Sequence, residues 1–167
     1  MNRMPRLLDS SVGQKVITAA TGLGLLGFVV AHLIGNLQMF LGPEAINGYA
    51  YKLKSMGPLL WAPRIGLLAL IATHVMMTVR LTMRNRKAVA ATNTKVSRRA
   101  STTSSRSMIV SGSVILAFVI FHLLHFTMGV IQPAAYAIKD AAGRHDVFTM
   151  VVRGFEKFRV TTRGDRD

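Results

Sequence analysis

Three long runs without charge constrain this chain more than any other feature. They cover residues 16–41, 59–79 and 108–131, and their only charged side chain is Arg64, near the start of the second run. A helix needs about 20 mostly apolar residues to cross the hydrocarbon core of a bilayer. An arginine near the end of such a helix reaches the interface. The sequence therefore predicts an all-α transmembrane bundle with three spanning helices.

The strong positive charge of the chain fits the same prediction. Lys and Arg number 21 against 7 Asp and Glu, which gives a formal net charge of +14. A charge this basic is common in nucleic-acid-binding proteins, but such proteins do not carry long uncharged apolar runs. A positive mean hydropathy of +0.36 favours a membrane protein with basic flanks and no nucleic-acid partner. The absence of cysteine excludes disulfides and thiolate metal sites.

The basic residues also predict the orientation of the chain. They are concentrated in residues 1–15 and in the connection 80–106, which contains no acidic residue, whereas residues 42–58 are nearly balanced. Because basic segments stay in the cytoplasm, we expect the N-terminus and the second connection to be cytoplasmic. The Ser- and Thr-rich part of that connection predicts a solvated loop. The positive charge of this connection has two interpretations. It sets the topology and attracts anionic lipid, or it docks a soluble partner.

We expect a single membrane-anchor domain over residues 1–167. After Pro133 the sequence DAAGRHDVFTMVVRGFE predicts a short amphipathic helix at the interface, and residues 156–167 form a polar tail. Three helices bury little surface against one another, so a partner chain or an oligomer is expected.

Histidines inside the three runs are the candidate functional residues. They are His32, His74, and the pair His122 and His125 in the string FHLLHF. Ionisable side chains inside a membrane mark functional sites by default. At 1.5 Å per residue, His32 lies ~24 Å, His122 ~21 Å and His125 ~25 Å from the inner face, whereas His74 lies ~22 Å from the outer face. The histidines therefore form an outer layer on two helices and an inner layer that contains His74 alone.

Facing imidazoles on two helices are natural axial ligands of a haem iron. Zinc would need further thiolate or carboxylate ligands, which the runs lack. His122 and His125, at i and i+3, are expected to share one helical face. One of them would bind iron while the other hydrogen-bonds a propionate or a quinone, and the spacing leaves the choice open. Interhelical hydrogen bonding is the alternative role for a single histidine, and His145, outside the runs, is expected to be a surface residue.

Several strings resemble a known family. They are SVGQKVITAATGLGLLGFVVAHLIGNLQMFLGPEAINGYA, WAPRIGLLALIATHVMMTVRLTMRNR, SRSMIVSGSVILAFVIFHLLHFTMGVIQP and GRHDVFTMVVRGF. Together they are similar to the single-chain, cytochrome b558-like membrane anchors of succinate dehydrogenase and fumarate reductase. Members of this family have five spans and two b haems held by four histidines on four helices.

The resemblance implies a role for each histidine. In the family, the first and third spans hold one haem, and the second and fourth hold the other. His32 matches the first ligand and His74 the second, while the third falls on His122 or His125, with His122 favoured because it follows an apolar FVIF run. The family's last two spans would follow VVRGF, where this chain has EKFRVTTRGDRD. A truncation, a shifted reading frame near Phe155 or a naturally short variant would each give such an ending, and in each case the fourth ligand is expected to be missing and His74 to have no partner in this chain.

The resemblance also implies a biochemical role. The chain would anchor a flavoprotein and an iron–sulfur subunit of this tricarboxylic acid cycle complex in the bacterial cytoplasmic (inner) membrane. It would pass electrons to or from a membrane quinone through haem b, without being a dehydrogenase on its own. Glu44 is a candidate for proton handling, and Lys52, Lys54 and Arg64 are candidates for contacts to haem propionates. The alternative is a haem-free membrane remnant or scaffold whose histidines bind no cofactor.

Overall fold

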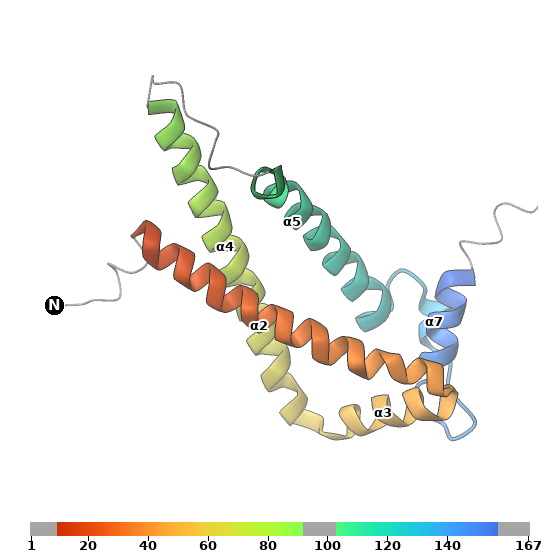
Figure 1. Cartoon of the computed structure of the whole chain (residues 1–167). Helices are drawn as coiled ribbons and strands as arrows, with labels where there is room; N and C mark the ends of the chain where they lie inside the picture. Colours follow the sequence, from red (N-terminus) through yellow and green to blue (C-terminus); the bar gives the residue numbers. More distant parts are fainter. Residues whose placement is uncertain (1–9, 92–102, 157–167) are drawn as a thin grey trace, which may run out of the picture. The chain divides into compact units, whose positions relative to one another are not determined.

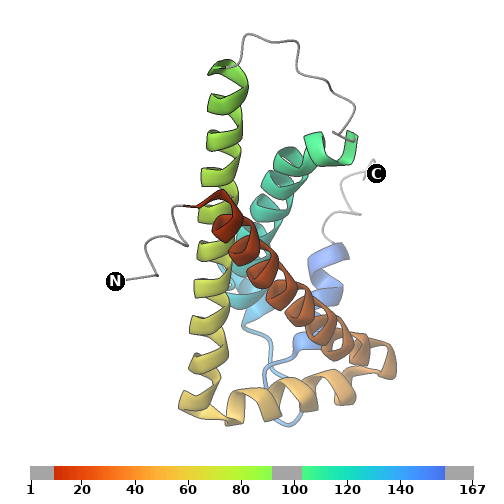
Figure 2. The same cartoon turned by 60° about the vertical axis from the view of Figure 1, so that its left-hand side comes forward.

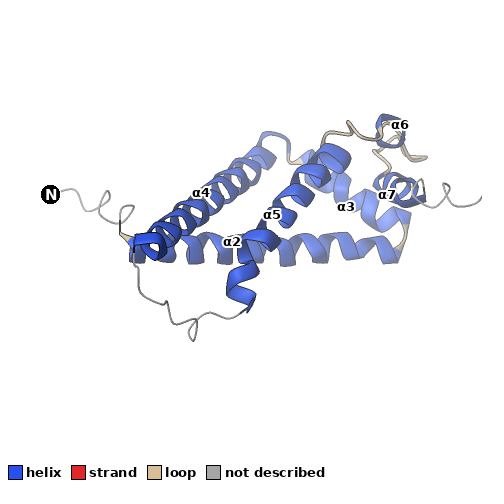
Figure 3. Cartoon of the chain, turned by 90° about the horizontal axis from the view of Figure 1, so that it is seen from above, coloured by secondary structure: helices blue, strands red, loops and turns tan. Residues whose placement is uncertain are grey.

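The computed structural model describes residues 10–91 and 103–156, and all of their regular elements are helices (Figures 1 and 3). The long ones are α2 (Ser11–Leu37), α4 (Trp61–Ala91) and α5 (Thr103–His122), and the short ones are α3 (Pro43–Ser55), α6 (Pro133–Tyr136) and α7 (Val147–Glu156). One isolated bridge, between Lys139 and His145, is the only β pairing in this part of the chain. The predicted all-α fold is confirmed.

Three segments are long and apolar enough to cross a membrane: Ser11–Leu41, Gly57–Ala88 and Ser107–Thr127. They coincide with the three predicted spans, and they make the chain a multi-pass membrane protein. In the most apolar part of the first and third segments, none of the residues is buried within the chain. Lipid or further helices must therefore cover these surfaces, since water would not.

The limits of the spans differ from the prediction in two places. Helix α4 continues to Ala91, so the start of the predicted loop 80–106 is helical, and residues 103–106 already belong to α5. Residues 92–102, and the tail from 157 onward, lie outside the described residues. The third span stops being helical at Thr127 rather than at Ile131, because Gly129 takes a positive φ of 67°.

Contacts divide the chain into two compact units. Unit 1 comprises Met1–Ile34 and Met56–Arg98, and its described part is most of α2 together with α4. These two helices cross (Figures 1 and 2). A Cβ on Gly24 would lie 3.4 Å from Cδ1 of Leu70, so the two backbones are close there. Ser10 caps the start of α2, since its hydroxyl accepts a hydrogen bond from the Gly13 amide at 2.9 Å.

Unit 2 comprises Gly35–Ser55 and Arg99–Asp167, and it holds the small apolar core outside the spans. Helix α7 lies against both α3 and α6, and each of the three helices contributes one buried apolar side chain: Ile46, Ala135 and Met150.

A left-handed glycine closes the third span. A Cβ on Gly129 would lie 2.3 Å from Cγ of Tyr136, whose hydroxyl donates a hydrogen bond to the Thr127 carbonyl at 3.0 Å. No real Cβ contact is that short, so the glycine is required for steric reasons as well as for its φ.

We expect Gly129→Ala to loosen unit 2 far more than Gly143→Ala does. Gly143 has a similar φ of 75° but has no atom within 4 Å of its Cβ position, so it reports the backbone strain alone. That strain costs about 1–2 kcal/mol, and Gly129→Ala adds the clash with Tyr136. Amide hydrogen exchange in α7 measures the difference, and equal protection in the two variants would contradict this packing.

Candidate functional site

His74, in the middle of α4, is held by a hydrogen bond from α2. Its Nδ1 lies 3.1 Å from Oγ1 of Thr21, and the same oxygen lies 2.8 Å from the carbonyl oxygen of Ile17. Which atom donates in this contact depends on the tautomer of the ring. When the Thr21 hydroxyl donates to the Ile17 carbonyl, Oγ1 accepts from Nδ1–H, and the lone pair of the imidazole is then on Nε2, the atom that would bind a metal.

A glycine of α2 lies against the His74 ring. The Cβ of any larger residue at Gly22 would be 3.2 Å from Cε1 of His74 and 3.6 Å from its Nδ1. The distance to Cε1 is shorter than ordinary van der Waals contact, so a side chain at position 22 would shift the ring of His74. Gly22 and Thr21 therefore both set the orientation of His74.

His125 is the most buried histidine of the described residues. It is 4% exposed, and neither of its ring nitrogens has a hydrogen-bond partner. Phe126 stacks on the ring at 4.1 Å and 27°, Phe121 meets it edge-on at 5.4 Å, and a Cβ on Gly154 of α7 would lie 3.5 Å from Nε2. Buried imidazole nitrogens are nearly always paired, so an unpaired ring in an apolar cage calls for a partner.

A π-helical turn over Leu123–Thr127 separates His125 from His122. The prediction that the two histidines share one face assumed an α-helix throughout, and both of their rings lie beside Phe126, at 5.3 Å for His122 and 4.1 Å for His125. A π turn, with its i→i+5 hydrogen bonds, rotates less per residue than an α turn, and it often marks functional sites. His125 points into the contact with α7, whereas His122 is only half-buried between the rings of Phe118 and Phe126.

His32 is exposed on α2 and stacks on Phe28 at 5.3 Å and 25°. In the same way, Phe118 lies beside His122 and Phe121 lies beside His125, each four residues before its histidine. This spacing puts two residues on one helical face. This F-x-x-x-H pattern is visible in the sequence, and the sequence analysis missed it. His32 and His74 belong to unit 1 and the other pair to unit 2, so the pairing of His32 with His122 or His125 stays a prediction.

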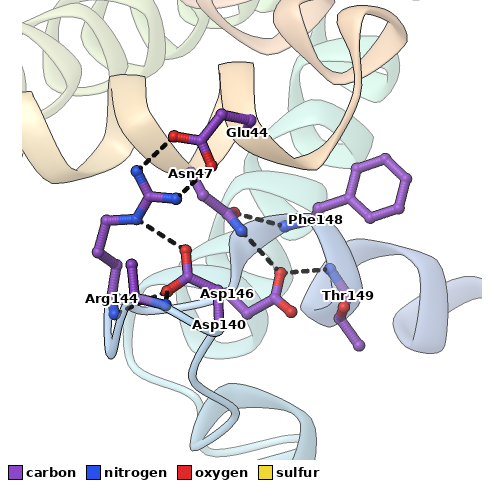
Figure 4. A network of polar contacts seen from close by, with 8 residues as sticks. Glu44, Asn47, Asp140, Arg144, Asp146, Phe148 and Thr149 are labelled. Atoms are coloured by element: carbon purple, nitrogen blue, oxygen red, sulfur yellow. Dashed lines mark hydrogen bonds and ion pairs between the residues drawn. The ribbon is translucent and has the colours of Figure 1, made fainter.

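A second cluster of polar residues, outside the spans, joins α3 to the segment before α7 (Figure 4). Arg144 donates two hydrogen bonds to the carboxylate of Glu44, at 2.9 and 2.6 Å, and a third to Asp140 at 2.7 Å. The hydrogen bonds and the charge of Arg144 lower the pKa of Glu44. Burial raises the pKa of Asp140, but hydrogen bonds from the Arg144 side chain and backbone outweigh it, so the net shift is downward.

Asn47 ties α3 to the first turn of α7 (Figure 4). It is 1% exposed, its amide nitrogen donates to Asp146 at 3.0 Å, and its oxygen accepts from the Phe148 amide at 3.1 Å. Asp146 caps the helix by accepting from the Thr149 amide at 3.0 Å. Two otherwise unpaired amides at the start of α7 are thereby satisfied, one of them by a residue of another helix.

The remaining candidate residues lie outside the two histidine environments. Glu44, the candidate for proton handling, is held as a carboxylate by its ion pair with Arg144. The guanidinium of Arg64 lies 5.2 Å from the centre of the Trp61 ring, and Lys52 is exposed in the last turn of α3. His145, which was expected at the surface, is half-buried against Tyr136. Its burial is the main cause of a lowered pKa, and the positive charge of Lys54 lowers the pKa further.

Comparison of the chain with protein-family models, with curated proteins and with solved structures finds no match.

We expect Thr21→Val to release the tautomer of His74. Valine keeps the shape of threonine but removes the oxygen that accepts from Nδ1–H, so the Nε2–H tautomer becomes populated. The ¹⁵N shifts of the His74 imidazole measure the two forms. Thr18→Val is the matched control, because the Thr18 hydroxyl bonds only the Gln14 carbonyl in the described contacts. Unchanged shifts in Thr21→Val would contradict the assigned hydrogen bond.

We expect the attachment of α3 to the Arg144 segment to weaken only in acid. Because the pKa values of Glu44 and Asp140 are lowered in the folded chain, their contribution to stability is complete above their unfolded values of about 4.5 and 3.8. It is lost as the pH falls through the lower folded values. Thermal unfolding in detergent between pH 6 and pH 3 should show this loss, and Glu44→Gln should reduce its size. An equal loss in that variant would contradict the assignment.

Proposed function

We propose that this chain is a haem b-containing membrane anchor subunit of a succinate:quinone oxidoreductase, either a succinate dehydrogenase or a fumarate reductase. It passes electrons between the iron–sulfur subunit and a membrane quinone. The proposal rests on the resemblance carried by AHLIGNLQMFLGPEA and FHLLHFTMG, and on the state of the histidines in the spans.

The observation that supports it most directly is the hydrogen bond between Thr21 and His74. An axial ligand must be a neutral imidazole with a lone pair directed away from its hydrogen-bonded nitrogen. With the Thr21 hydroxyl donating to Ile17, the contact at Nδ1 would leave the lone pair of His74 on Nε2, as such a ligand requires. The described residues contain no group of three or more His, Cys, Asp and Glu side chains that could hold a metal. Two histidines suffice for haem iron, because the porphyrin supplies the other ligands, so the donor set fits a haem.

Each residue then has a distinct part. His32 and His122 hold the iron of the outer haem, with His125 as the alternative to His122, and His74 offers Nε2 to the inner haem. Gly22 keeps the α2 backbone close to the His74 ring, and Thr21 prevents the ring from turning. A bound haem supplies one-electron redox chemistry.

Partner subunits complete the proposed activity. The flavoprotein carries the chemistry at succinate or fumarate, and the iron–sulfur subunit delivers or accepts electrons at the cytoplasmic side. The proposed location is the bacterial cytoplasmic membrane, with the N-terminus inside, since residues 80–106 carry the strongest basic charge.

A visible spectrum of the chain, purified from membranes in detergent, tests the proposal. We expect a low-spin b-type spectrum with about one haem per chain by pyridine haemochrome, because two facing histidines complete one outer site. His32→Ala and His122→Ala should remove it, and His74→Ala should retain it. His145→Ala, which changes a histidine outside the spans, is the matched control.

The variants also decide between His122 and His125 as the second ligand of the outer haem. Loss of haem in His125→Ala, with retention in His122→Ala, would transfer the ligand role to His125 and leave the redox proposal intact. A chain with native helical circular dichroism that takes up no haem, even when haem is added during expression, would overturn the proposal. It would favour the haem-free scaffold instead.

A further inference from the structure

Each histidine of the first and third spans lies beside a phenylalanine four residues earlier, and the proposed function gives these contacts no role. Phe28 stacks on His32 with the ring centres 5.3 Å apart and the ring planes at 25°. Phe118 lies beside His122 at 5.7 Å and 33°. Both separations are typical of interacting aromatic rings, whose centres lie about 4.5–7 Å apart.

The direction of side chains on a helix explains these contacts. Helical side chains lean toward the N-terminus, so a ring at position i+4 lies over the residue at position i. Once the backbone has set this direction, the imidazole turns mainly about its Cβ–Cγ bond. A phenyl ring against the face of the imidazole obstructs that turn, so the phenylalanine restrains the plane of the histidine that follows it.

Stacking on the face also leaves the imidazole nitrogens open. Both nitrogens lie in the plane of the ring, and the lone pair of a neutral imidazole points outward in that plane. A phenyl ring on the face therefore restrains the histidine without covering the atom that would bind iron. Phe121 differs, because its plane meets that of His125 at 66°, closer to edge-on. The stacked geometry therefore distinguishes His32 and His122 from His125.

Neither phenylalanine belongs to a core of its unit. Phe28 is 40% exposed and Phe118 is 61% exposed. Leucine at either position would remove the aromatic ring and keep an apolar side chain with a high helix propensity. The contact with histidine can therefore be removed with little effect on the helix that carries it.

We propose that Phe28 and Phe118 are positioning residues for the haem ligands, and that each fixes the plane of the imidazole one turn later. This inference rests on the proposed function, in which His32 and His122 bind the same iron. In a low-spin ferric haem, the angle between the two axial imidazole planes determines the g values. Contacts that orient a ligand are also one means by which a protein tunes a bound metal.

Electron paramagnetic resonance of the oxidised full chain in detergent tests the proposal. We expect Phe28→Leu and Phe118→Leu to keep the haem content but to shift and broaden the lowest-field signal, because the imidazole planes are no longer restrained. Phe28→Tyr keeps the aromatic face and should keep the original signal. The proton shifts of the His32 ring give a reading without haem, since loss of the phenyl ring current should change them in Phe28→Leu.

The matched controls are Phe40→Leu on the first span and Phe121→Leu on the third. Phe40 is 87% exposed and lies beyond His32 in the chain, so both controls should keep the original signal. Unchanged signals in Phe28→Leu and Phe118→Leu would overturn the positioning role, and so would equal shifts in the controls. Haem and the proposed function would remain in both cases. A chain without haem would overturn the proposed function itself, and the positioning role with it.

Discussion

The requirement that backbone polar groups find partners within the chain governs the spans. Lipid offers neither donors nor acceptors, so each crossing segment must be helical and its polar side chains must bond locally. The threonines and serines of the spans do so: Thr18, Thr21, Thr78 and Ser113 each donate to a carbonyl oxygen one turn earlier in their own helix. The oxygen of Thr21 also lies 3.1 Å from Nδ1 of His74, so the same side chain bonds its own helix and contacts the facing one.

A different kind of interaction organises the part of the chain outside the spans. Only Ile46, Ala135 and Met150 form its apolar core, which is too small to hold three short helices by itself. Asn47 and Arg144 supply the connection, because each bonds groups that are far away in the sequence. Burying Asn47 costs little as long as both of its amide atoms are paired, and a variant that left Asp146 or the Phe148 amide unpaired would cost about 1–3 kcal/mol.

The sequence predicted the spans well because their signal is compositional. Nearly charge-free runs of sufficient length allow almost no other structure, and Pro63 and Gly66 did not disturb the second run. Features that depend on contacts between distant residues were not predictable. Nothing in the letters NGYA indicates that Asn47 is nearly fully buried, and the bond between Glu44 and Arg144 joins positions 100 residues apart. The π turn was missed for another reason, since FHLLHFT has a normal helical composition and nothing in its letters marks a change of winding.

The two histidines of FHLLHF show how winding assigns different environments to neighbouring side chains. An α-helix would put both on one face, with similar access to a ligand from a facing helix. The π turn instead directs His125 toward α7, where the absence of a Cβ at Gly154 leaves room for the ring. His122 stays at the end of the regular helix and is only half-buried. A ligand arriving from outside unit 2 would meet His122 first and would reach His125 only if α7 moved. This difference in access, which does not use the family resemblance, favours His122 as the outer ligand and gives His125 the role of contact residue for α7.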